Sequence, residues 1–490
     1  MSSSVSHLLR EAIERHAEAG ATAFVEGERS TSYEELGRLI DGYAAAFRDL
    51  GVTWGEPVGF LTPKTVRAIA AYFGAMQAGA CVCFFEPQLS AEAVADQMDT
   101  VRMRRIVIDD AAWERFDGPA LGSRGAVRLG ALVPIGAFAD RNLKGEDAAM
   151  LLFTSGSTGK PKGVVLLHRG LVLNAEGVRE ATGISPQDVL LHVMPIYHTN
   201  GVNNQLIAPL LSGATVELVD RFRAEDVVAR LRAGGISYMT GVPTMYSRML
   251  PFVAEGEAFP GLKFLRCGSA PITPALHEQI EAAFGVPLVV SYGLSEATCT
   301  STLNPPDARR IGTIGKVLPG QEVALFDPVT NEKVADGAEG EIRISGAALM
   351  KGYLGANVEQ PIVDGWLRTG DLGRFDADGY LAITGRIKDV IIRGGENISP
   401  ALIERQLATH PAIRDCCVVG GAHADLGEVP VAFVVMRDGA ALDQDGLKEF
   451  VKSSLARIYV PSEFRALETL PTNGVGKTDR KALKKLLEAS

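Results

Sequence analysis

Residues 153–163 read Phe-Thr-Ser-Gly-Ser-Thr-Gly-Lys-Pro-Lys-Gly and follow directly on a run of strand-forming residues, 148–154. The three glycines allow backbone N–H groups to wrap an oxyanion, and the hydroxyl and lysine side chains add further donors. A Walker A loop is excluded, because it needs a glycine and a hydroxyl residue where this chain has Thr154 and Pro161. We interpret residues 153–163 as a phosphate-binding loop; the alternative is a flexible surface turn.

The sequence around this loop alternates between short β-branched runs and longer helical segments. After the strand at 148–154, strands are predicted at 188–194, 215–219, 236–239, 262–266 and 287–291, and helices at 223–232 and 273–284. Such alternation is typical of a parallel sheet with helices on its faces. Residues 30–110 have a similar pattern, so we predict a second α/β layer there.

The pattern changes after residue 293. Residues 311–386 are rich in Gly, Asp and β-forming residues, which predicts an antiparallel β subdomain. The rest of the chain predicts helices at 400–408, 443–456 and from 479, with strands at 413–419, 429–436 and 463–468. We therefore expect an α/β protein with a large N-terminal domain, 1–386, that contains the parallel sheets and the β subdomain, and a small mobile α+β C-terminal domain, 387–490.

The composition limits the classes of function. The chain has 490 residues, 46% hydrophobic and 22% charged, which is ample for a large core. Its formal charge of −10 argues against a protein that binds nucleic acid through clustered basic residues. The six cysteines form no disulfide framework and no Cys-x-x-Cys pair. With no signal peptide and no run of about 20 apolar residues, we expect a cytoplasmic protein without a membrane span, a monomer or a homodimer.

Four further segments carry a family resemblance. They are Tyr292-Gly-Leu-Ser-Glu296, Thr369-Gly-Asp371, Gly385-Arg-Ile-Lys-Asp389 and the segment from Leu470 to Arg480 with Gly476-Lys477 at its centre. Together with residues 153–163, they resemble the adenylate-forming superfamily of acyl-CoA and aryl-CoA synthetases, peptide adenylation domains and luciferases. The resemblance covers nearly the whole chain and implies an enzyme that joins a carboxylic acid to a thiol, using ATP, Mg²⁺ and CoA.

The resemblance implies a nucleotide site in which Tyr292 stacks on adenine and Asp371 holds the ribose. Glu296 follows a strand and a turn, where its carboxylate could hold Mg²⁺ against the ATP phosphates. Taken alone, Glu296 could instead be solvated and Asp371 could cap a turn. The nucleotide-binding residues implied by the resemblance are Thr154, Ser155, Gly156, Ser157, Thr158, Gly159, Lys160, Gly268, Ser269, Ala270, Pro271, Tyr292, Gly293, Ser295, Asp371 and Arg386.

The implied reaction has two halves. The acid's carboxylate attacks the α-phosphorus of ATP to give an acyl adenylate and pyrophosphate, and the CoA thiol then displaces AMP. The resemblance implies that Lys477 neutralises the charge growing at the α-phosphate, although an isolated lysine in such a loop is usually only solvated. It also implies that the C-terminal domain swings about Lys388 and exchanges Lys477 for a pantetheine tunnel lined by Gly394, Gly395, Glu396 and Asn397.

Residues 194–201, Met-Pro-Ile-Tyr-His-Thr-Asn-Gly, indicate the branch of the family. Amino-acid-activating domains carry an Asp near this position, whereas acyl-CoA and aryl-CoA ligases often have Pro-x-x-His-x-x-Gly, as here. We therefore expect an AMP-forming acid:CoA ligase in which His198 contacts the substrate carboxylate; a hydrogen-bonded loop histidine is the alternative. The alternative activities are loading of a carrier-protein phosphopantetheine and, more distantly, non-catalytic nucleotide binding.

The residues expected to line the acid pocket form a mixed, partly polar set. They are His198, Asn200, Asn203, Gly241, Gly268, Ser291, Cys299 and Thr300. Because unpaired polar groups in an apolar pocket cost about 1–3 kcal/mol each, this set favours a small aryl or short polar acid over a long alkyl chain. Malonate-type ligases carry an arginine where this chain has Ser291, which weighs against a dicarboxylate unless Arg266 serves instead. The alternative role for Arg266 is an ion pair at a strand end.

Overall fold

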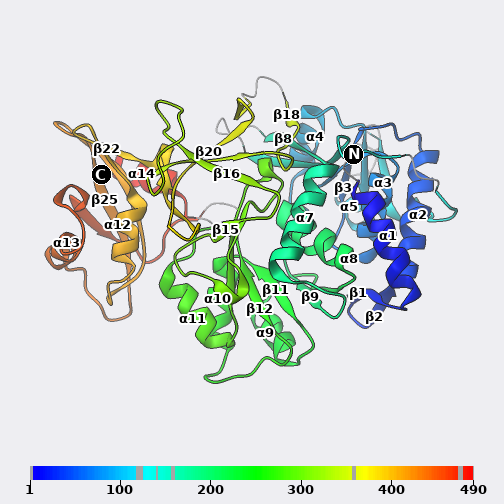
Figure 1. The fold of residues 1–490 in the computed structure, drawn as a ribbon, viewed down its shortest axis with the longest axis horizontal. Coiled ribbons are helices and arrows are strands. Elements are labelled where there is room, and N and C mark those ends of the chain that lie inside the picture. The colour runs from blue at the N-terminus through cyan, green and yellow to red at the C-terminus, as the bar shows by residue number, and fades with distance from the viewer. Residues whose placement is uncertain are drawn as a thin grey trace.

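The computed structural model describes residues 4–116, 125–138, 142–155, 161–355, 360–472 and 478–488. Within these residues the strands form four sheets, of seven, nine, five and five strands. The blue and cyan N-terminal helices and the orange and red C-terminal sheet lie at opposite ends of the molecule, and the green strands β11 (Tyr238–Gly241), β12 (Phe264–Cys267) and β15 (Lys316–Val317) lie between them (Figure 1). None of the helices in the described ranges is long and apolar enough to cross a bilayer.

The seven-stranded sheet carries the predicted phosphate loop. Its order is β18-β8-β7-β4-β3-β5-β6. The strands are β3 (Pro57–Leu61), β4 (Cys81–Phe84), β5 (Arg105–Ile108), β6 (Ala126–Arg128), β7 (Ala148–Ser155), β8 (Pro161–Leu167) and β18 (Gly352–Leu354). Strands β3 to β7 run parallel, which confirms the second α/β layer. The local pattern groups residues 148–154 with the strands that follow them. Strand β7 instead pairs with β4, because long-range packing rather than local periodicity sets strand order.

The nine-stranded sheet contains the other strands predicted between 188 and 291. Its order is β15-β14-β13-β12-β11-β9-β10-β1-β2. The strands are β1 (Thr22–Glu26), β2 (Arg29–Ser32), β9 (Val189–His192), β10 (Thr215–Leu218), β11 (Tyr238–Gly241), β12 (Phe264–Cys267), β13 (Leu288–Tyr292), β14 (Thr302–Leu303) and β15 (Lys316–Val317). Its central strands are parallel, as the alternation predicts. The carboxyl ends of β11, β12 and β13 therefore meet at one edge.

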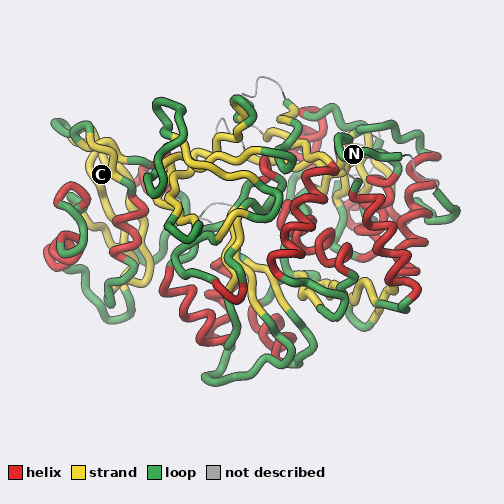
Figure 2. The backbone as a smooth tube through the Cα atoms, viewed as in Figure 1, coloured by secondary structure: helices red, strands yellow, loops and turns green. Residues whose placement is uncertain are grey.

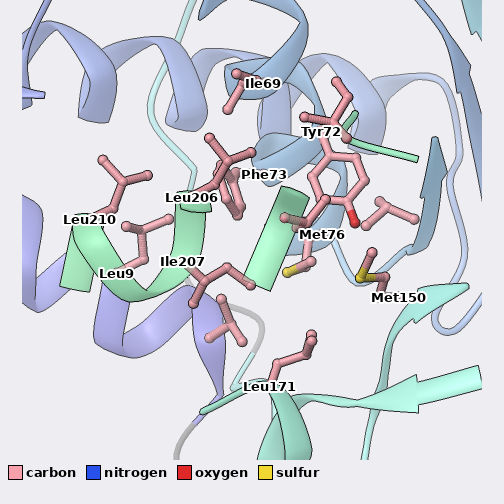
Figure 3. Packing of buried hydrophobic residues seen from close by; sticks show 14 of the residues in the cluster. Leu9, Ile69, Tyr72, Phe73, Met76, Met150, Leu171, Leu206, Ile207 and Leu210 are labelled. Atoms are coloured by element: carbon pink, nitrogen blue, oxygen red, sulfur yellow. The ribbon is translucent and has the colours of Figure 1, made fainter. Parts of the chain in front are cut away.

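Helices fill the space between these two sheets (Figure 2). They are α1 (Val5–Glu18), α2 (Tyr33–Asp49), α3 (Val66–Gln77), α7 (His168–Thr182), α8 (Ala208–Ser212) and the π-helix η2 (Asn200–Ile207). Figure 3 shows how Leu9, Phe73, Met76, Leu171 and Leu206 from these helices point toward one another in the main core. The core fixes η2 from both sides, and η2 carries several of the predicted acid-pocket residues.

The outer faces of the two sheets are covered by shorter helices. α4 (Ala91–Thr100) and α5 (Asp110–Arg115) pack on the seven-stranded sheet, and α9 (Ala224–Arg232), α10 (Pro243–Met249) and α11 (Pro274–Phe284) pack on the nine-stranded sheet. Local signals explain their bounds. The side chain of Thr273 accepts a hydrogen bond from the N–H of Leu276 at the start of α11, and Gly285 ends the helix in the left-handed conformation.

Residues 322–386 form an antiparallel five-stranded sheet, within the range predicted for the β subdomain. Its strands are β16 (Glu322–Phe326), β17 (Gly340–Ser345), β19 (Ile362–Val363), β20 (Trp366–Phe375) and β21 (Leu381–Arg386). Strands β20 and β21 pair in register with Asp371 opposite Arg386. This pairing brings the two residues implied for ribose binding together.

The three helices and three longer strands predicted for the C-terminal part are present, and the last sheet has two further short strands, Ile391–Arg393 and Glu396–Ile398, that the sequence pattern did not predict. The strands are β22 (Ile391–Arg393), β23 (Glu396–Ile398), β24 (Ile413–His423), β25 (Gly427–Met436) and β26 (Glu463–Ala466), and the helices are α12 (Pro400–Leu407), α13 (Gln444–Lys452) and α14 (Arg480–Glu488). This unit contacts β21 through Arg405, whose guanidinium donates to the carbonyl of Ile383 at 3.1 Å. Ser399 also donates to the carbonyl of Thr384.

Candidate functional site

The predicted phosphate loop joins β7 and β8 as a hairpin. Ser155 stands opposite Pro161, and Thr154 stands opposite Lys162. The predicted contacts Gly156, Ser157, Thr158, Gly159 and Lys160 lie outside the described residues. The hydroxyl oxygen of Thr154 is buried and has no hydrogen-bond partner in the described structure. Because a buried polar atom normally has a partner, this hydroxyl suits a ligand oxygen at the end of β7.

Glu296 lies beside this hairpin, in the 3₁₀ turn Ser295–Ala297 that follows β13. The phenol of Tyr353 on β18 donates a hydrogen bond to its carboxylate at 2.6 Å. The ammonium of Lys162 lies 3.9 Å from the same carboxylate and 3.6 Å from the centre of the Tyr353 ring. Burial lowers the pKa of Lys162, while the charge of Glu296 acts in the opposite direction. The carboxylate of Glu296 is therefore held in place rather than freely solvated.

The surroundings of Glu296 fit a magnesium ion held mainly by nucleotide phosphates. Within the described ranges no three His, Cys, Asp or Glu side chains gather into a metal cage. Mg²⁺ commonly uses one or two protein carboxylates and takes its other oxygen ligands from phosphates and water. Glu296, with its side chain 15% exposed next to the phosphate hairpin, meets that requirement.

Asp371 is the centre of a second polar group. Its carboxylate accepts a hydrogen bond from the phenol of Tyr292 at 2.7 Å, and the guanidinium of Arg386 lies 2.7 Å from its other oxygen. The Asp371 side chain is 4% exposed, whereas Arg386 is half exposed. Burial and the charge of Asp371 raise the pKa of Tyr292. The structure thus brings together the three residues implied for adenine and ribose. The Asp371 side chain contacts Tyr292 and Arg386 and is therefore not only a turn cap.

The loop after β13 is tightly constrained. A Cβ atom added to Gly293 would lie 1.7 Å from the carbonyl oxygen of Cys299, so only glycine fits at this position. Thr298, Cys299 and, in the 268–271 loop, Ser269 have positive φ values. Such conformations cost energy in residues with side chains and cluster at functional sites. The loops that carry the implied nucleotide contacts Gly268, Ser269, Ala270, Pro271 and Gly293 both leave the carboxyl edge of the nine-stranded sheet.

A buried polar network lies next to these loops and contains four of the eight predicted acid-pocket residues: Asn200, Ser291, Cys299 and Thr300. Asn204 donates to Asn200 at 3.0 Å, to Thr300 at 3.2 Å and to the thiol of Cys299 at 3.0 Å. The guanidinium of Arg266 donates to Thr300 at 2.7 Å and to Ser291 at 3.4 Å. Sequence reasoning missed Asn204, although its position one residue after the predicted Asn203 was a signal.

Three other predicted pocket residues lie differently. Asn203 is buried and donates to Asn174 and to the carbonyl of Thr298, so its amide also holds the loop after β13. Gly241 packs against the ring of Tyr246, whose atoms lie 3.2 Å from an added Cβ, and does not join the network. His198 is exposed on the loop between β9 and η2, with its ring 4.6 Å from that of Tyr197.

The residues expected at the hinge and tunnel lie in the C-terminal part. Lys388 is exposed in the 3₁₀ turn Ile387–Asp389 that connects β21 to β22. Gly394 and Gly395 form the turn between β22 and β23 with φ values of 59° and 90°, and Glu396 and Asn397 begin β23. Lys477 lies outside the described residues.

Comparison with known proteins identifies the family. The model of AMP-binding enzymes matches residues 9–354, and the model of the AMP-binding enzyme C-terminal domain matches residues 402–477. The chain belongs to the AMP-binding enzyme family. The expected adenylate-forming superfamily, its acyl- and aryl-CoA synthetase branch and the α/β fold class are thereby confirmed, and the chain is an acid–thiol ligase.

Three relatives of this family member illustrate the similarity. The chain is 39% identical over 337 residues to a sulfoacetate–CoA ligase of Cupriavidus necator, a match that covers 68% of this chain and 66% of that protein. It is 32% identical over 471 residues to a feruloyl-CoA synthase of Amycolatopsis, which covers 93% and 94% of the two chains. The structure of ATP-bound MatB from Rhodopseudomonas palustris matches with a TM-score of 0.89 at 27% identity and covers 99% of both chains.

Proposed function

We propose that this AMP-forming acid:CoA ligase activates a small acid, either a short polar acid or a small aryl acid, and transfers the acyl group to CoA. The observation that carries the proposal is the arrangement around β13. Tyr292 at its end contacts Asp371, and Glu296, four residues later, lies beside the phosphate hairpin. The named relatives act on acids of both kinds: sulfoacetate is short and polar, and ferulate is a small aryl acid.

The chain's own residues would bind ATP in three places. Tyr292 would pack on adenine, the Asp371 carboxylate would accept hydrogen bonds from the ribose hydroxyls, and Arg386 would donate to the ribose. The 153–163 hairpin with Ser295 would hold the phosphates. Glu296 would hold Mg²⁺, which supplies positive charge to the phosphates when bound. Attack of the acid's carboxylate on the α-phosphorus then needs mainly positioning and charge stabilisation, which we assign to Lys477 and His198.

The second half-reaction requires a different arrangement of the C-terminal part. We assign residues 1–386 and 387–490 to two domains that move about Lys388, so that Lys477 leaves and residues 394–397 line a path for the pantetheine arm. The 3₁₀ turn at 387–389 supports this role, because none of its residues is buried in a core that would oppose rotation. A cytoplasmic location and a monomeric or homodimeric state remain predictions.

The activity is tested by incubating the protein with ATP, Mg²⁺, CoA and a panel of aromatic, short-chain, dicarboxylic and long-chain acids. We expect AMP and a thioester with at least one small acid. Release of no AMP with any acid would contradict the proposal. Replacing free CoA by a holo-carrier protein distinguishes the alternative acceptor, which would then be the faster substrate.

The role of Lys477 has a sharper test. Lys477→Ala should slow acyl adenylate formation by orders of magnitude and leave thioester formation from supplied acyl adenylate largely intact. Lys481→Ala, which removes a nearby exposed lysine on α14, serves as the matched control and should affect neither step. Equal losses in both half-reactions of Lys477→Ala would contradict the domain movement.

A further inference from the structure

Arg266 is a buried cation that has no carboxylate partner among the residues that the structure describes. It is 2% exposed, in the middle of the nine-stranded sheet on β12. Among the described residues, no Asp or Glu oxygen lies within 4.0 Å of its guanidinium, so the ion pair considered from the sequence is absent. The other arginine buried among the described residues does have such a partner: Arg343, 4% exposed at its side chain, pairs with Glu341 at 2.8 Å. Burying an unpaired charge costs free energy, so the lack of a carboxylate partner for Arg266 in the described structure needs an explanation.

The groups around Arg266 are neutral. In the described structure its hydrogen-bond partners are the hydroxyls of Thr300 at 2.7 Å and Ser291 at 3.4 Å, which use two of the five N–H donors of a guanidinium. Behind Thr300 stand the thiol of Cys299 and the amide of Asn204. Burial raises the pKa of the Cys299 thiol, which keeps it protonated and uncharged at neutral pH.

A neighbouring strand adds a polar atom without a partner. Thr240 on β11 stands beside Arg266 in the parallel register, so both side chains lie on the same face of the sheet. Thr240 is 1% exposed, and its hydroxyl has no hydrogen-bond partner in the described structure. A cation with spare donors and an unpartnered hydroxyl on the same face suit an anionic group that accepts several hydrogen bonds.

Arg266 lies close in the chain to the loop implied to border the adenine of the nucleotide. Cys267 ends β12, and the implied adenine loop begins at Gly268, two residues after Arg266. An added Cβ at Gly268 would lie 3.0 Å from the hydroxyl of Ser291, which itself contacts Arg266. With a nucleotide bound against this loop, as the family resemblance implies, an acid held for attack on that nucleotide would lie close to the guanidinium.

We propose that Arg266 binds a second anionic group of the substrate, so that the acid is a short dianion with a carboxylate or sulfonate one or two carbons from the reacting carboxylate. This inference rests on the proposed ligase function and narrows its choice of acid. A dianion balances the buried charge, whereas a small aryl or alkyl acid leaves the guanidinium unpaired against an apolar surface. Thr300, Ser291 and Thr240 complete the subsite by hydrogen bonding to the anion and to the guanidinium.

The test compares acids of matched length. AMP release and thioester formation are measured with propanedioate and sulfoacetate against propanoate, and with butanedioate against butanoate. We expect kcat/KM to be about 10²- to 10³-fold higher for at least one dianion than for the matched monoanion, because the monoanion leaves the buried cation unpaired. The sulfonate and dicarboxylate arms show which anion the subsite takes. Equal turnover of dianion and monoanion overturns the inference, whereas no AMP with any acid contradicts the ligase proposal itself.

Three variants assign the effect to Arg266. Arg266→Met should remove most of the preference for the dianion, so that the ratio of kcat/KM for the dianion and the matched monoanion falls toward one. Thr300→Asp supplies a carboxylate beside the guanidinium and should also abolish the preference, which keeps the test decisive if Arg266→Met does not fold. Arg230→Met, a control that breaks the pair with Glu217 on β10, should keep the wild-type ratio of the two acids. The inference would be contradicted if Arg266→Met lowered kcat/KM equally for both acids, or if Thr300→Asp left the ratio of the two kcat/KM values unchanged. Arg266 would then have only a structural role.

Discussion

Replacing Asp371 by asparagine removes the charge that we assign to the ribose. The side chain is 4% exposed, and Tyr292 and Arg386 each contact one of its oxygens at 2.7 Å. A hydrogen bond to a charged acceptor contributes about 1.5–3 kcal/mol, roughly twice a neutral one. Asparagine keeps one weaker acceptor and turns the other into a donor. The two ribose hydroxyls should therefore lose about 3 kcal/mol in total, which is about a hundredfold in Kd.

The assay is calorimetric titration of the protein with AMP and with 2′,3′-dideoxy-AMP. Wild-type protein should bind AMP about a hundredfold more tightly than the dideoxy nucleotide, whereas Asp371→Asn should bind both with nearly the weaker affinity. This comparison isolates the hydroxyl contacts, because any general damage to the site affects both nucleotides. If Asp371→Asn still distinguished the two nucleotides by the wild-type factor, Asp371 would not be the ribose acceptor.

Two controls accompany this experiment. Asp376→Asn changes an aspartate just after the same strand, paired with Arg310 and more exposed, and should leave both affinities unchanged. The free energy of unfolding of Asp371→Asn should fall by only about 1 kcal/mol, because Tyr292 keeps an acceptor and the pair with half-exposed Arg386 contributes little.

Three further predictions concern other parts of the structure. Gly293→Ala places a Cβ 1.7 Å from the Cys299 carbonyl oxygen. Chemical denaturation should show that the free energy of unfolding falls by about 1–3 kcal/mol, and AMP release should be slower for every acid. Wild-type values of both would contradict the inference that only glycine fits at this position. Tyr353→Phe removes the hydroxyl that donates a hydrogen bond to Glu296. Half-saturation of the activity by Mg²⁺ should then need about tenfold more metal. An unchanged Mg²⁺ dependence would contradict the assignment of Glu296 as the magnesium ligand. Burial lowers the pKa of His168 to about 4. Below about pH 6.5 the unfolded chain binds a proton at this histidine and the folded chain does not, so the free energy of unfolding should fall by about 2 kcal/mol between pH 8 and pH 5. His168→Gln should reduce this dependence of the unfolding free energy on pH.

Local patterns were sufficient to predict the central strands of the nine-stranded sheet and most elements of the C-terminal part. Alternating β-branched runs gave the strands that became β9 to β13, and capping residues such as Thr273 and Gly285 bounded α11. The sheet to which β7 belongs was not predictable in this way, because its partner β4 lies more than sixty residues earlier in the chain. Strand order depends on which apolar faces pack together, and periodicity describes only the face of each element.

The candidate site shows the same division. Motifs indicated Tyr292, Glu296 and Asp371, whose side chains the structure places in contact with further polar groups. Tyr353 belongs to no motif and reaches Glu296 only because β18 pairs with β8, with Tyr353 opposite Val164. The lack of a carboxylate next to Arg266 among the described residues was also not predictable from the sequence. A sequence contains every carboxylate of the chain but does not show which of them lie close to a given arginine.

The two neighbouring residues at the end of β13 explain how one nucleotide site can serve different acids. Successive side chains of a strand point to opposite faces, so Ser291 and Tyr292 face different surroundings. The hydroxyl of Ser291 contacts Arg266, in the proposed acid subsite, and the phenol of Tyr292 contacts Asp371, in the nucleotide site. A substitution at 291 or 266 can therefore change which acid is accepted without moving the ribose contacts. Relatives of this chain bear the names of acids as different as sulfoacetate and ferulate, and such a separation is compatible with that range.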